Sequence, residues 1–186
     1  MHIDLNSDLG ESFGPWPMGA DDELIPLVSS VNIACGAHAG DPATIARTVR
    51  LAVAHGAAIG AHPGYPDLAG FGRRDLDMAA DDLDASLIVQ IGAVQAVARS
   101  EGAIVHHVKP HGALYNRAAR DPGLARTIAT AIARLDAGLV LVGLAGSALL
   151  DAGPDARALR GNGGVGRTGG GQRGSLIDHP KPRPKG

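Results

Sequence analysis

Strand-like and helix-like segments alternate along most of this chain, and the alternation limits the folds that it can adopt. Five apolar segments have the length and composition of strands, at residues 2–8, 30–35, 57–62, 103–109 and 138–144. Helical patterns lie between them, at residues 41–55, 80–99 and 121–135. Because strands that alternate with helices pair in parallel through right-handed crossovers, the sequence predicts an α/β fold.

The helix predicted at residues 41–55 has the clearest boundaries. Asp41 can cap its first turn, Pro42 suits the first helical position, and Gly56 can end it. Asp121 and Pro122 open the helix that runs to about residue 135.

The first and fourth predicted strands each have one polar face. Because strand side chains alternate between faces, Asp4, Asn6 and Asp8 lie together on the first strand. His107 and Lys109 share a face of the fourth strand in the same way. A buried strand of an open doubly wound sheet is usually apolar on both faces, whereas a polar face suits the interior or rim of a barrel. The sequence therefore favours a TIM-like β/α barrel.

Five strands do not close such a barrel, which needs seven or eight. After residue 152 the chain becomes rich in glycine, proline and basic residues and loses its apolar periodicity. We therefore expect a barrel domain at residues 1–152, incomplete at its C-terminal end, and a segment at residues 153–186 that is disordered or frameshifted.

Composition excludes several classes of protein. Cys35 is the single cysteine, which rules out a disulfide framework and fits a reducing compartment. The chain begins without a signal-peptide pattern, and no apolar run approaches the ~20 residues that span a bilayer. The body is acidic, which disfavours a nucleic-acid surface. We expect a cytoplasmic protein that binds neither nucleic acid nor membrane.

Reactive side chains gather at four glycine-flanked junctions, where a strand gives way to a loop or helix. Barrel enzymes place their chemistry at this end of their strands. The junctions are NSDLGES with Asn6, Asp8 and Glu11; ACGAHAGD with Cys35, His38 and Asp41; GAHPGYPD with His62, Tyr65 and Asp67; and KPHGALYN with Lys109, His111 and Tyr115.

These groups suit the hydrolysis of an amide or ester. A carboxylate can act as general base on water, a histidine can protonate a leaving nitrogen, and a lysine can bind an oxyanion or a substrate carboxylate. Alternatively, Asp8, His38 and His62 could hold a divalent metal ion that activates water directly. No local metal motif such as H-E-x-x-H supports this alternative.

Several of these residues also have a structural explanation. Asp41 is expected to act first as a helix cap, and Cys35 as a small buried residue. His106, on the apolar side of the fourth strand, is expected to be packed or partly buried. His107 could be either a structural residue or a member of the site. The junction histidines could be loop side chains that bond to the backbone, although their repetition at successive strand ends disfavours this.

The four junctions strongly resemble the LamB/YcsF family, which is described as the A subunit (PxpA) of the prokaryotic 5-oxoprolinase. The matching segments are IDLNSDLGESFG, NIACGAHAGDP, IGAHPGYPDLAGFGRR and HVKPHGALYN, in the family's order over about residues 1–150. The resemblance implies a seven-stranded, TIM-like β/α barrel related to carbohydrate deacetylase-like barrels. It also implies ATP-dependent opening of the lactam of 5-oxoproline to glutamate, together with the B and C subunits (PxpB and PxpC). The sequence has no P-loop for ATP, which agrees with this division of labour.

The resemblance also implies which residues form the site. Its catalytic positions correspond to Asp8, His38, His62, Lys109 and His111, and its substrate-binding positions to Asn6, Glu11, Asp41 and Tyr115. In the roles we assign, Asp8 is the general base, and His38 and His62 orient water or a metal ion. Lys109 binds the substrate carboxylate or the oxyanion, and His111 donates a proton.

The C-terminal end departs from the family, whose members continue for two more strand–helix units. This leaves two alternatives to a working 5-oxoprolinase component. One is a metal-dependent hydrolase that acts on acetylated carbohydrate, which the barrel type and the His/Asp groups suggest. The other is an inactive fragment that only binds the partner subunits.

Overall fold

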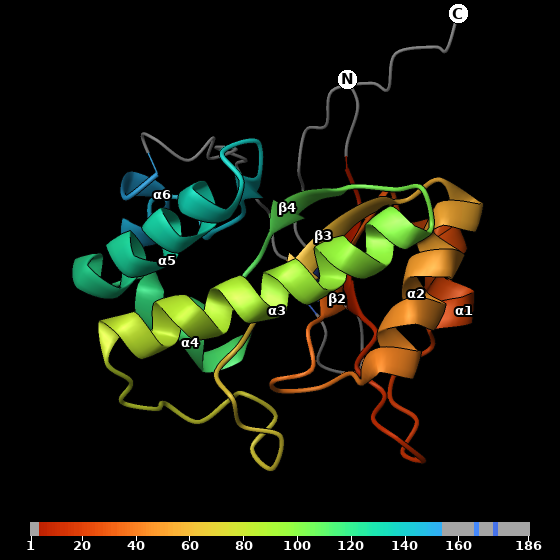
Figure 1. The fold of residues 1–186 in the computed structure, drawn as a ribbon, viewed down its shortest axis with the longest axis horizontal. Coiled ribbons are helices and arrows are strands. Elements are labelled where there is room, and N and C mark those ends of the chain that lie inside the picture. Colours follow the sequence, from red (N-terminus) through yellow and green to blue (C-terminus); the bar gives the residue numbers. More distant parts are fainter. Residues whose placement is uncertain (1–3, 154–165, 168–172, 175–186) are drawn as a thin grey trace, which may run out of the picture.

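The computed structural model of the chain describes residues 4–153, 166–167 and 173–174. Five parallel strands form one sheet in the order in which they occur along the chain (Figure 1). They are β1 (Asn6–Leu9), β2 (Ser30–Ala34), β3 (Ala58–His62), β4 (Val105–Val108) and β5 (Val140–Leu141). A sequential order of parallel strands is the order found around a β/α barrel, whereas a doubly wound sheet reverses its order at a switch point. The predicted α/β class and the five predicted strands are confirmed.

A second, antiparallel pair is formed by β6 (Gly166–Arg167) and β7 (Arg173–Gly174). The disorder or frameshift expected at residues 153–186 otherwise concerns residues outside those that the structure describes.

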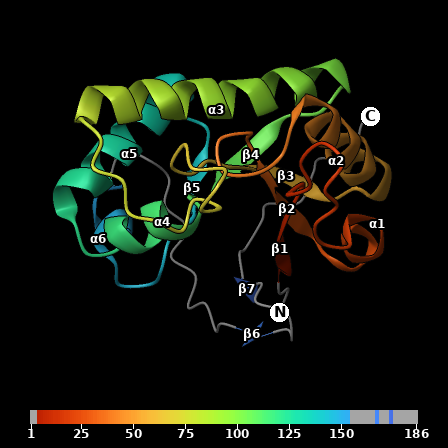
Figure 2. The same cartoon turned by 90° about the horizontal axis from the view of Figure 1, so that it is seen from below.

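Helices connect successive strands and lie along one side of the sheet (Figure 2). The helical segments are α1 (Asp21–Leu24), the 3₁₀ turn η1 (Ile25–Leu27), α2 (Pro42–His55), α3 (Ala80–Ser100), α4 (Gly112–Ala118), α5 (Pro122–Leu135) and α6 (Ala148–Asp151). None of the helices among the described residues has the length and apolarity that crossing a membrane requires.

The ends of α2 follow from its sequence, as predicted. Asp41 Oδ1 accepts hydrogen bonds from the backbone N–H groups of Ala43 and Thr44, each at 2.9 Å. Pro42 occupies the first helical position, where a missing N–H costs nothing. Gly56 ends the helix with φ +69°, a conformation that glycine adopts without strain.

The two faces of the sheet bury different kinds of side chain. On the helix side, Val31 and Ile33 of β2 are buried in an aliphatic core together with Ile91 of α3. On the other face, the buried side chains of Asn6 and Asn32 are polar. The polar interior expected for a barrel is therefore present, and the aliphatic side chains that hold the helices against the sheet supply the hydrophobic stabilisation.

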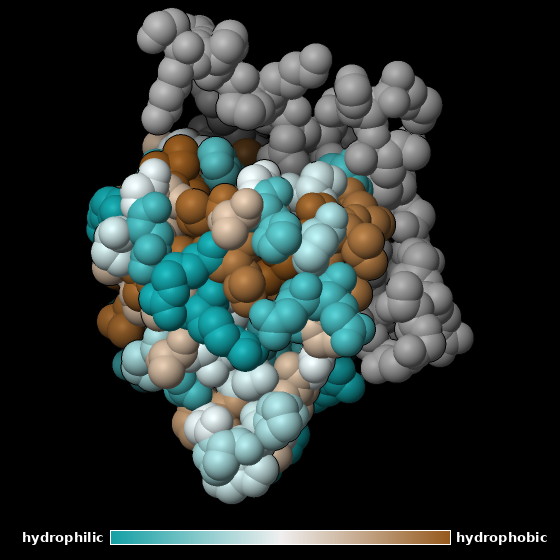
Figure 3. Space-filling view, turned by 90° about the vertical axis from the view of Figure 1, so that its right-hand side faces the viewer, coloured by the Kyte–Doolittle hydropathy of each residue, from teal (hydrophilic) through white to brown (hydrophobic). Residues whose placement is uncertain are grey.

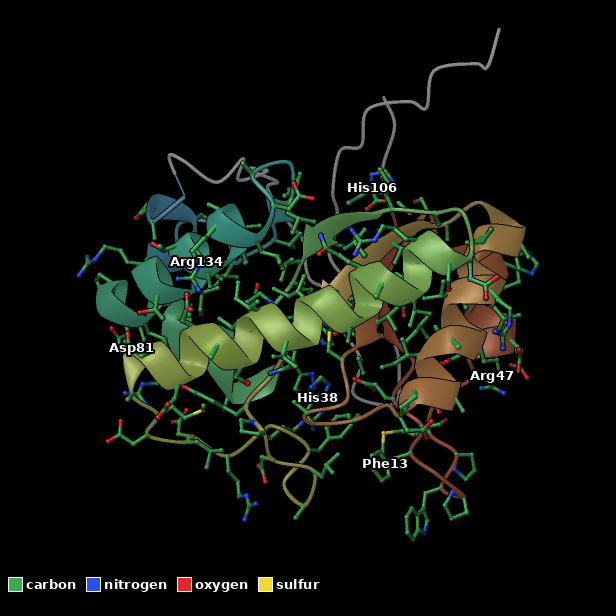
Figure 4. The ribbon with its side chains drawn as sticks, in the orientation of Figure 1. Phe13, His38, Arg47, Asp81, His106 and Arg134 are labelled. Atoms are coloured by element: carbon green, nitrogen blue, oxygen red, sulfur yellow. The ribbon has the colours of Figure 1, made fainter. Side chains whose placement is uncertain are left out.

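His106 corrects one prediction, because it is exposed rather than packed. Figure 4 places it at the upper edge of the sheet, above α3. Ile104, two residues earlier on the same face, is 63% exposed. The outer face at the start of β4 therefore lacks a helix to cover it. His107, the next residue, is fully buried on the inner face.

The loop that joins β1 to α1 projects from the body of the molecule (Figure 3). Phe13 and Trp16 exchange two backbone hydrogen bonds of 3.0 Å, which close the loop into a short hairpin. Gly14 N donates to Asp41 Oδ2 at 2.7 Å and ties the loop to the start of α2. Phe13 and His38 lie at the same, lower end of the molecule in Figure 4, so the loop stands beside the carboxyl ends of the strands.

Candidate functional site

The predicted reactive groups converge at the carboxyl ends of β1 to β4. Four connecting segments supply them: the β1–α1 loop carries Glu11, the β2–α2 loop carries His38, β3 ends at His62, and Lys109 and His111 follow β4. Figure 4 shows the labelled His38 at the lower end of the sheet. Parallel pairing places the carboxyl ends of all four strands at one edge, which is why side chains far apart in sequence meet here.

A partly buried ion pair joins the first and fourth strands. Lys109 Nζ donates hydrogen bonds to Asp8 Oδ1 at 2.8 Å and to Asp8 Oδ2 at 3.0 Å. Asn32 Nδ2 donates to Asp8 Oδ1 at 2.6 Å. Burial alone would raise the pKa of Asp8, but His62, which is protonated in the acidic range where Asp8 titrates, the Lys109 ammonium and these hydrogen bonds outweigh it and hold that pKa well below its usual range. Asp8 is therefore a carboxylate at neutral pH.

His62 and His111 are each held by a backbone carbonyl. His62 Nδ1 lies 2.6 Å from the carbonyl oxygen of Lys109, and His111 Nε2 lies 2.8 Å from that of Phe71. The remaining ring nitrogens, His62 Nε2 and His111 Nδ1, face each other at 3.0 Å. Burial lowers the pKa of His62 to about 3 and also lowers that of His111. Both rings are neutral at pH 7.

His38 lies directly against this pair. Its ring stacks on that of His111 with centroids 3.7 Å apart and planes 6° apart. Both ring nitrogens of His38 are buried and have no hydrogen-bond partner within the described part of the chain. Burial, followed by the nearby His111 and His62, holds its pKa well below the usual range. Such a ring is a neutral group that lacks the partner a buried imidazole normally has.

Glu11 completes a cluster that could hold a metal ion. Its Oε1 lies 3.9 Å from His111 Nδ1, and the side chain is buried. One ligand atom from each of Glu11, His38, His62 and His111 lies within 4.8 Å of all the others. The expected metal set was Asp8, His38 and His62. In the structure Asp8 is instead bonded to Lys109 and Asn32, and Glu11 and His111 join the two histidines.

The loop between β3 and α3 is shaped to reach His111. Phe71 has φ +55°, a strained conformation for a residue with a side chain, and its carbonyl is the one that meets His111. Gly72 follows with φ +61°, and a Cβ there would lie 2.8 Å from His38 Cβ and 2.9 Å from His111 Cδ2. Gly72 N donates to the carbonyl of Asp67 at 2.9 Å, which fixes the turn. Glycine is required here because both imidazoles approach the backbone.

A polar network beneath the site connects Asp8 to the interior of the sheet. Asn32 Nδ2 donates to Asn6 Oδ1 at 2.5 Å as well as to Asp8, and Asn32 Oδ1 lies 2.7 Å from His107 Nε2. Asn6 Nδ2 donates to Ser30 Oγ at 2.7 Å. Asn32 was not among the residues predicted from the sequence to form the site. The sequence of β2 does contain a pattern that could have predicted Asn32, because the polar Ser30 and Asn32 alternate with apolar residues.

Three predicted substrate-binding residues have other partners or positions. Both carboxylate oxygens of Asp41 cap α2 and hold the β1–α1 loop. Asn6 lies in the network below Asp8. Tyr115, on α4, is partly buried and packs against the hydrophobic core. Cys35 is buried, and burial raises the pKa of its thiol to about 12, which fits the structural role expected for it.

Comparison with known proteins gives consistent matches. A model of the LamB/YcsF family matches residues 3–160. The A subunit of 5-oxoprolinase from Tolumonas auensis is 55% identical over 154 residues, which cover 83% of this chain and 61% of that protein. The A subunit of 5-oxoprolinase from Bordetella pertussis is 56% identical over 150 residues, which cover 81% and 60%.

A solved structure agrees with these matches. The crystal structure of the lactam utilization protein from Thermus thermophilus superposes with a TM-score of 0.84 at 50% sequence identity, over 86% of this chain and 65% of that one. The chain thus spans about 60% of the length of the curated relatives described above.

Proposed function

The chain belongs to the LamB/YcsF family, and we propose that it supplies the hydrolytic site of an ATP-dependent 5-oxoprolinase. The reaction opens the lactam of 5-oxo-L-proline to L-glutamate. The relatives' names and the lactam utilization protein support the substrate class. The observation that carries the proposal is the partly buried Asp8–Lys109 pair beside three neutral histidines at the carboxyl ends of the strands.

The chemistry of the substrate explains why the proposed reaction needs ATP and partner subunits. Hydrolysis of an unstrained five-membered lactam is uphill, and phosphorylation of the carbonyl oxygen by ATP makes the carbonyl carbon open to attack. We assign ATP use to a complex with the B and C subunits (PxpB and PxpC), in line with the lack of a P-loop motif in this sequence. This chain then supplies the step in which water attacks.

Lys109 and Asp8 have different roles in that step: Lys109 binds the substrate, and Asp8 transfers the proton. A carboxylate whose pKa is held so low stays charged but is a weak base. When the substrate carboxylate or the oxyanion takes hydrogen bonds from Lys109, the ion pair weakens and the basicity of Asp8 rises. Asp8 then accepts a proton from the attacking water and returns it to the leaving nitrogen, as the carbon–oxygen bond forms and the carbon–nitrogen bond breaks. The acyl phosphate that remains is hydrolysed by a second water molecule, which releases inorganic phosphate and leaves glutamate.

We assign His111 a role other than the proton donor expected at this position. A carbonyl oxygen can only accept, so the proton of neutral His111 is on Nε2, where it bonds to Phe71. Its Nδ1 therefore presents a lone pair to the site. We assign to His38, His62 and His111 the orientation of the attacking oxygen, and we assign proton transfer to Asp8.

A second candidate function is hydrolysis of acetylated carbohydrate. The cluster of three histidines and one carboxylate is the observation that favours it, since such a group can hold a metal ion that activates water. The two functions differ in substrate and in their need for ATP.

A substrate panel distinguishes the two. The chain is assayed alone and with the B and C subunits, on 5-oxoproline with and without ATP and on N-acetylated sugars. Our proposal predicts glutamate release that needs ATP, both partners and this chain, with no acetate release from the sugars. Acetate release by the chain alone would replace the proposed function with the second one.

A further inference from the structure

We propose that Glu11, His38, His62 and His111 form a binding site for a transition-metal ion of the zinc class. All four side chains are buried, and they come from the carboxyl ends of four different strands or the loops that follow them. One ligand atom of each lies within 4.8 Å of the others. The geometry that points to a cation, rather than to a simple polar cluster, lies in the two hydrogen bonds that hold the rings.

The backbone selects the tautomer of two of the rings. His62 Nδ1 meets the carbonyl of Lys109, and His111 Nε2 meets the carbonyl of Phe71. Because a carbonyl oxygen accepts and never donates, each of these nitrogens carries the ring proton. In neutral rings the opposite nitrogens, His62 Nε2 and His111 Nδ1, are then lone pairs. A histidine that donates its outer N–H to a backbone carbonyl is the usual arrangement of a metal ligand.

The two lone pairs point into the same space. His62 Nε2 and His111 Nδ1 are 3.0 Å apart, and Asp8 Oδ2 lies 3.5 Å from His62 Nε2. Three electron-rich atoms so close repel one another unless a cation lies between them. A metal ion, which binds lone pairs directly, resolves the repulsion.

His38 provides an independent observation. Neither ring nitrogen has a hydrogen-bond partner among the described residues, although the side chain is only 1% exposed. A buried polar group left without a partner costs about 1–3 kcal/mol. The ring lies against His111, 3.7 Å between centroids, so it borders the space into which the two lone pairs point. Coordination of one nitrogen gives His38 the partner that it lacks.

The donor set selects the class of metal. Three imidazole nitrogens and one carboxylate oxygen suit Zn²⁺ and its transition-metal neighbours, whereas Mg²⁺ and Ca²⁺ prefer oxygen ligands alone. Tetrahedral ligands at a zinc–nitrogen distance of ~2.0–2.1 Å lie about 3.3 Å apart. The 3.0 Å separation of His62 Nε2 and His111 Nδ1 needs only a small widening to meet this. Binding stands on this geometry alone, and only the use of the ion in hydrolysis rests on the proposed function.

The test is a titration of the metal-free chain with ZnCl₂ by calorimetry, with zinc content measured by mass spectrometry after gel filtration. We expect one zinc ion per chain and Mg²⁺ affinity at least ~100-fold weaker. His38→Gln and Glu11→Gln should each weaken zinc binding by about 100-fold or more, since loss of an outer-shell partner alone costs ~10–100-fold. Exposed His106 lies outside the cluster, so His106→Gln is the control and should bind zinc like the wild type.

The outcomes separate the alternatives. Zinc binding that is absent, or that His38→Gln and Glu11→Gln leave unchanged, overturns the site and leaves a histidine cluster that shares only a proton. His38→Gln carries the test if another variant fails to fold, because the ring it removes makes no hydrogen bond among the described residues. Zinc binding without glutamate release from 5-oxoproline supports this site and contradicts the proposed function. Glutamate release by a zinc-free complex supports the proposed function and overturns the use of the ion in hydrolysis, whereas the titration alone decides whether the site binds zinc.

Discussion

Lys109 donates hydrogen bonds to both carboxylate oxygens of Asp8, at 2.8 and 3.0 Å, across 101 positions of sequence. The pair exists because β1 and β4 belong to one parallel sheet and present their polar faces to the same interior. It joins the first and fourth strands at the end where His62 and His111 also meet. The link between the two strands and the proposed catalytic step therefore depend on the same two residues.

Removing one member of this pair should destabilise the fold. Lys109→Met leaves the partly buried Asp8 carboxylate without its cation, and we expect a loss of about 3 kcal/mol in the free energy of unfolding, measured with urea. Asp8→Asn should also destabilise the chain. The double variant should lose much less than the sum of the two, because neither charge is then left unpaired. Additive losses would show that the pair is not coupled.

Asn32 should act as a positioning residue for Asp8. Asn32→Ala removes a 2.6 Å hydrogen bond to the carboxylate, so the pKa of Asp8 should rise toward its usual range. We expect kcat to fall by about tenfold with little change in KM, because loss of this hydrogen bond to a charged group frees the carboxylate from its position, and this outweighs the gain in basicity. The acidic limb of the pH–rate profile should therefore shift to higher pH. Asn116, exposed on α4, provides the control, and Asn116→Ala should leave both profile and rate unchanged.

The buried histidines should make stability depend on pH. The pKa of His62 is lowered to about 3 in the folded chain, against about 6.5 when unfolded, so the unfolded chain binds the proton more readily. Its contribution is fully present above pH ~6.5 and is lost as pH falls toward 3.

Metal-free protein should therefore lose about 1.4 kcal/mol per pH unit for this one group below pH ~6. Urea unfolding between pH 7 and 5 measures the slope. His62→Gln should flatten it, whereas His55→Gln, at the exposed end of α2, should not. Equal slopes in all three proteins would contradict the neutral state of His62.

Gly72 should tolerate no side chain. In Gly72→Ala the new Cβ would lie 2.8 Å from His38 Cβ, in addition to the cost of a left-handed backbone. Gly102 has a similar φ of +72° with no atom within 4 Å of the added Cβ, so Gly102→Ala measures the backbone cost alone, about 1 kcal/mol. We expect Gly72→Ala to be clearly less stable than this control and to lose zinc affinity. Thermal unfolding of both variants, with and without zinc, checks the difference.

Much of this fold follows from local sequence. The cap at Asp41, the end of α2 at Gly56 and the polar alternation of β1 all have the outcomes that their residue types predict. These features depend on neighbours within a few positions. The exposure of His106 was predicted wrongly, because it depends on how far α3 covers the sheet, which no local pattern records.

The sequence predicted which residues of the candidate site lie close together, but not the contacts that they make. The resemblance to the LamB/YcsF family, which the family match confirms, and the strand-end rule together gathered Asp8, His38, His62, Lys109 and His111. They did not show that Lys109 would hold Asp8, or that Glu11 would join the histidines. Those pairings depend on register between strands and on the path of the β3–α3 loop, which brings the Phe71 carbonyl to His111.

The central claim is that Asp8 activates water for opening of the 5-oxoproline lactam. The most direct measurement is the rate of glutamate release from 5-oxoproline and ATP by this chain with the B and C subunits, compared between the wild type and Asp8→Asn. We predict ATP-dependent release by the wild type and a fall in kcat of at least ~100-fold in the variant, in keeping with the ~10²–10⁴-fold contribution of general acid–base catalysis. Full activity of Asp8→Asn, or no release by the wild type while a full-length relative is active in the same assay, would contradict the account.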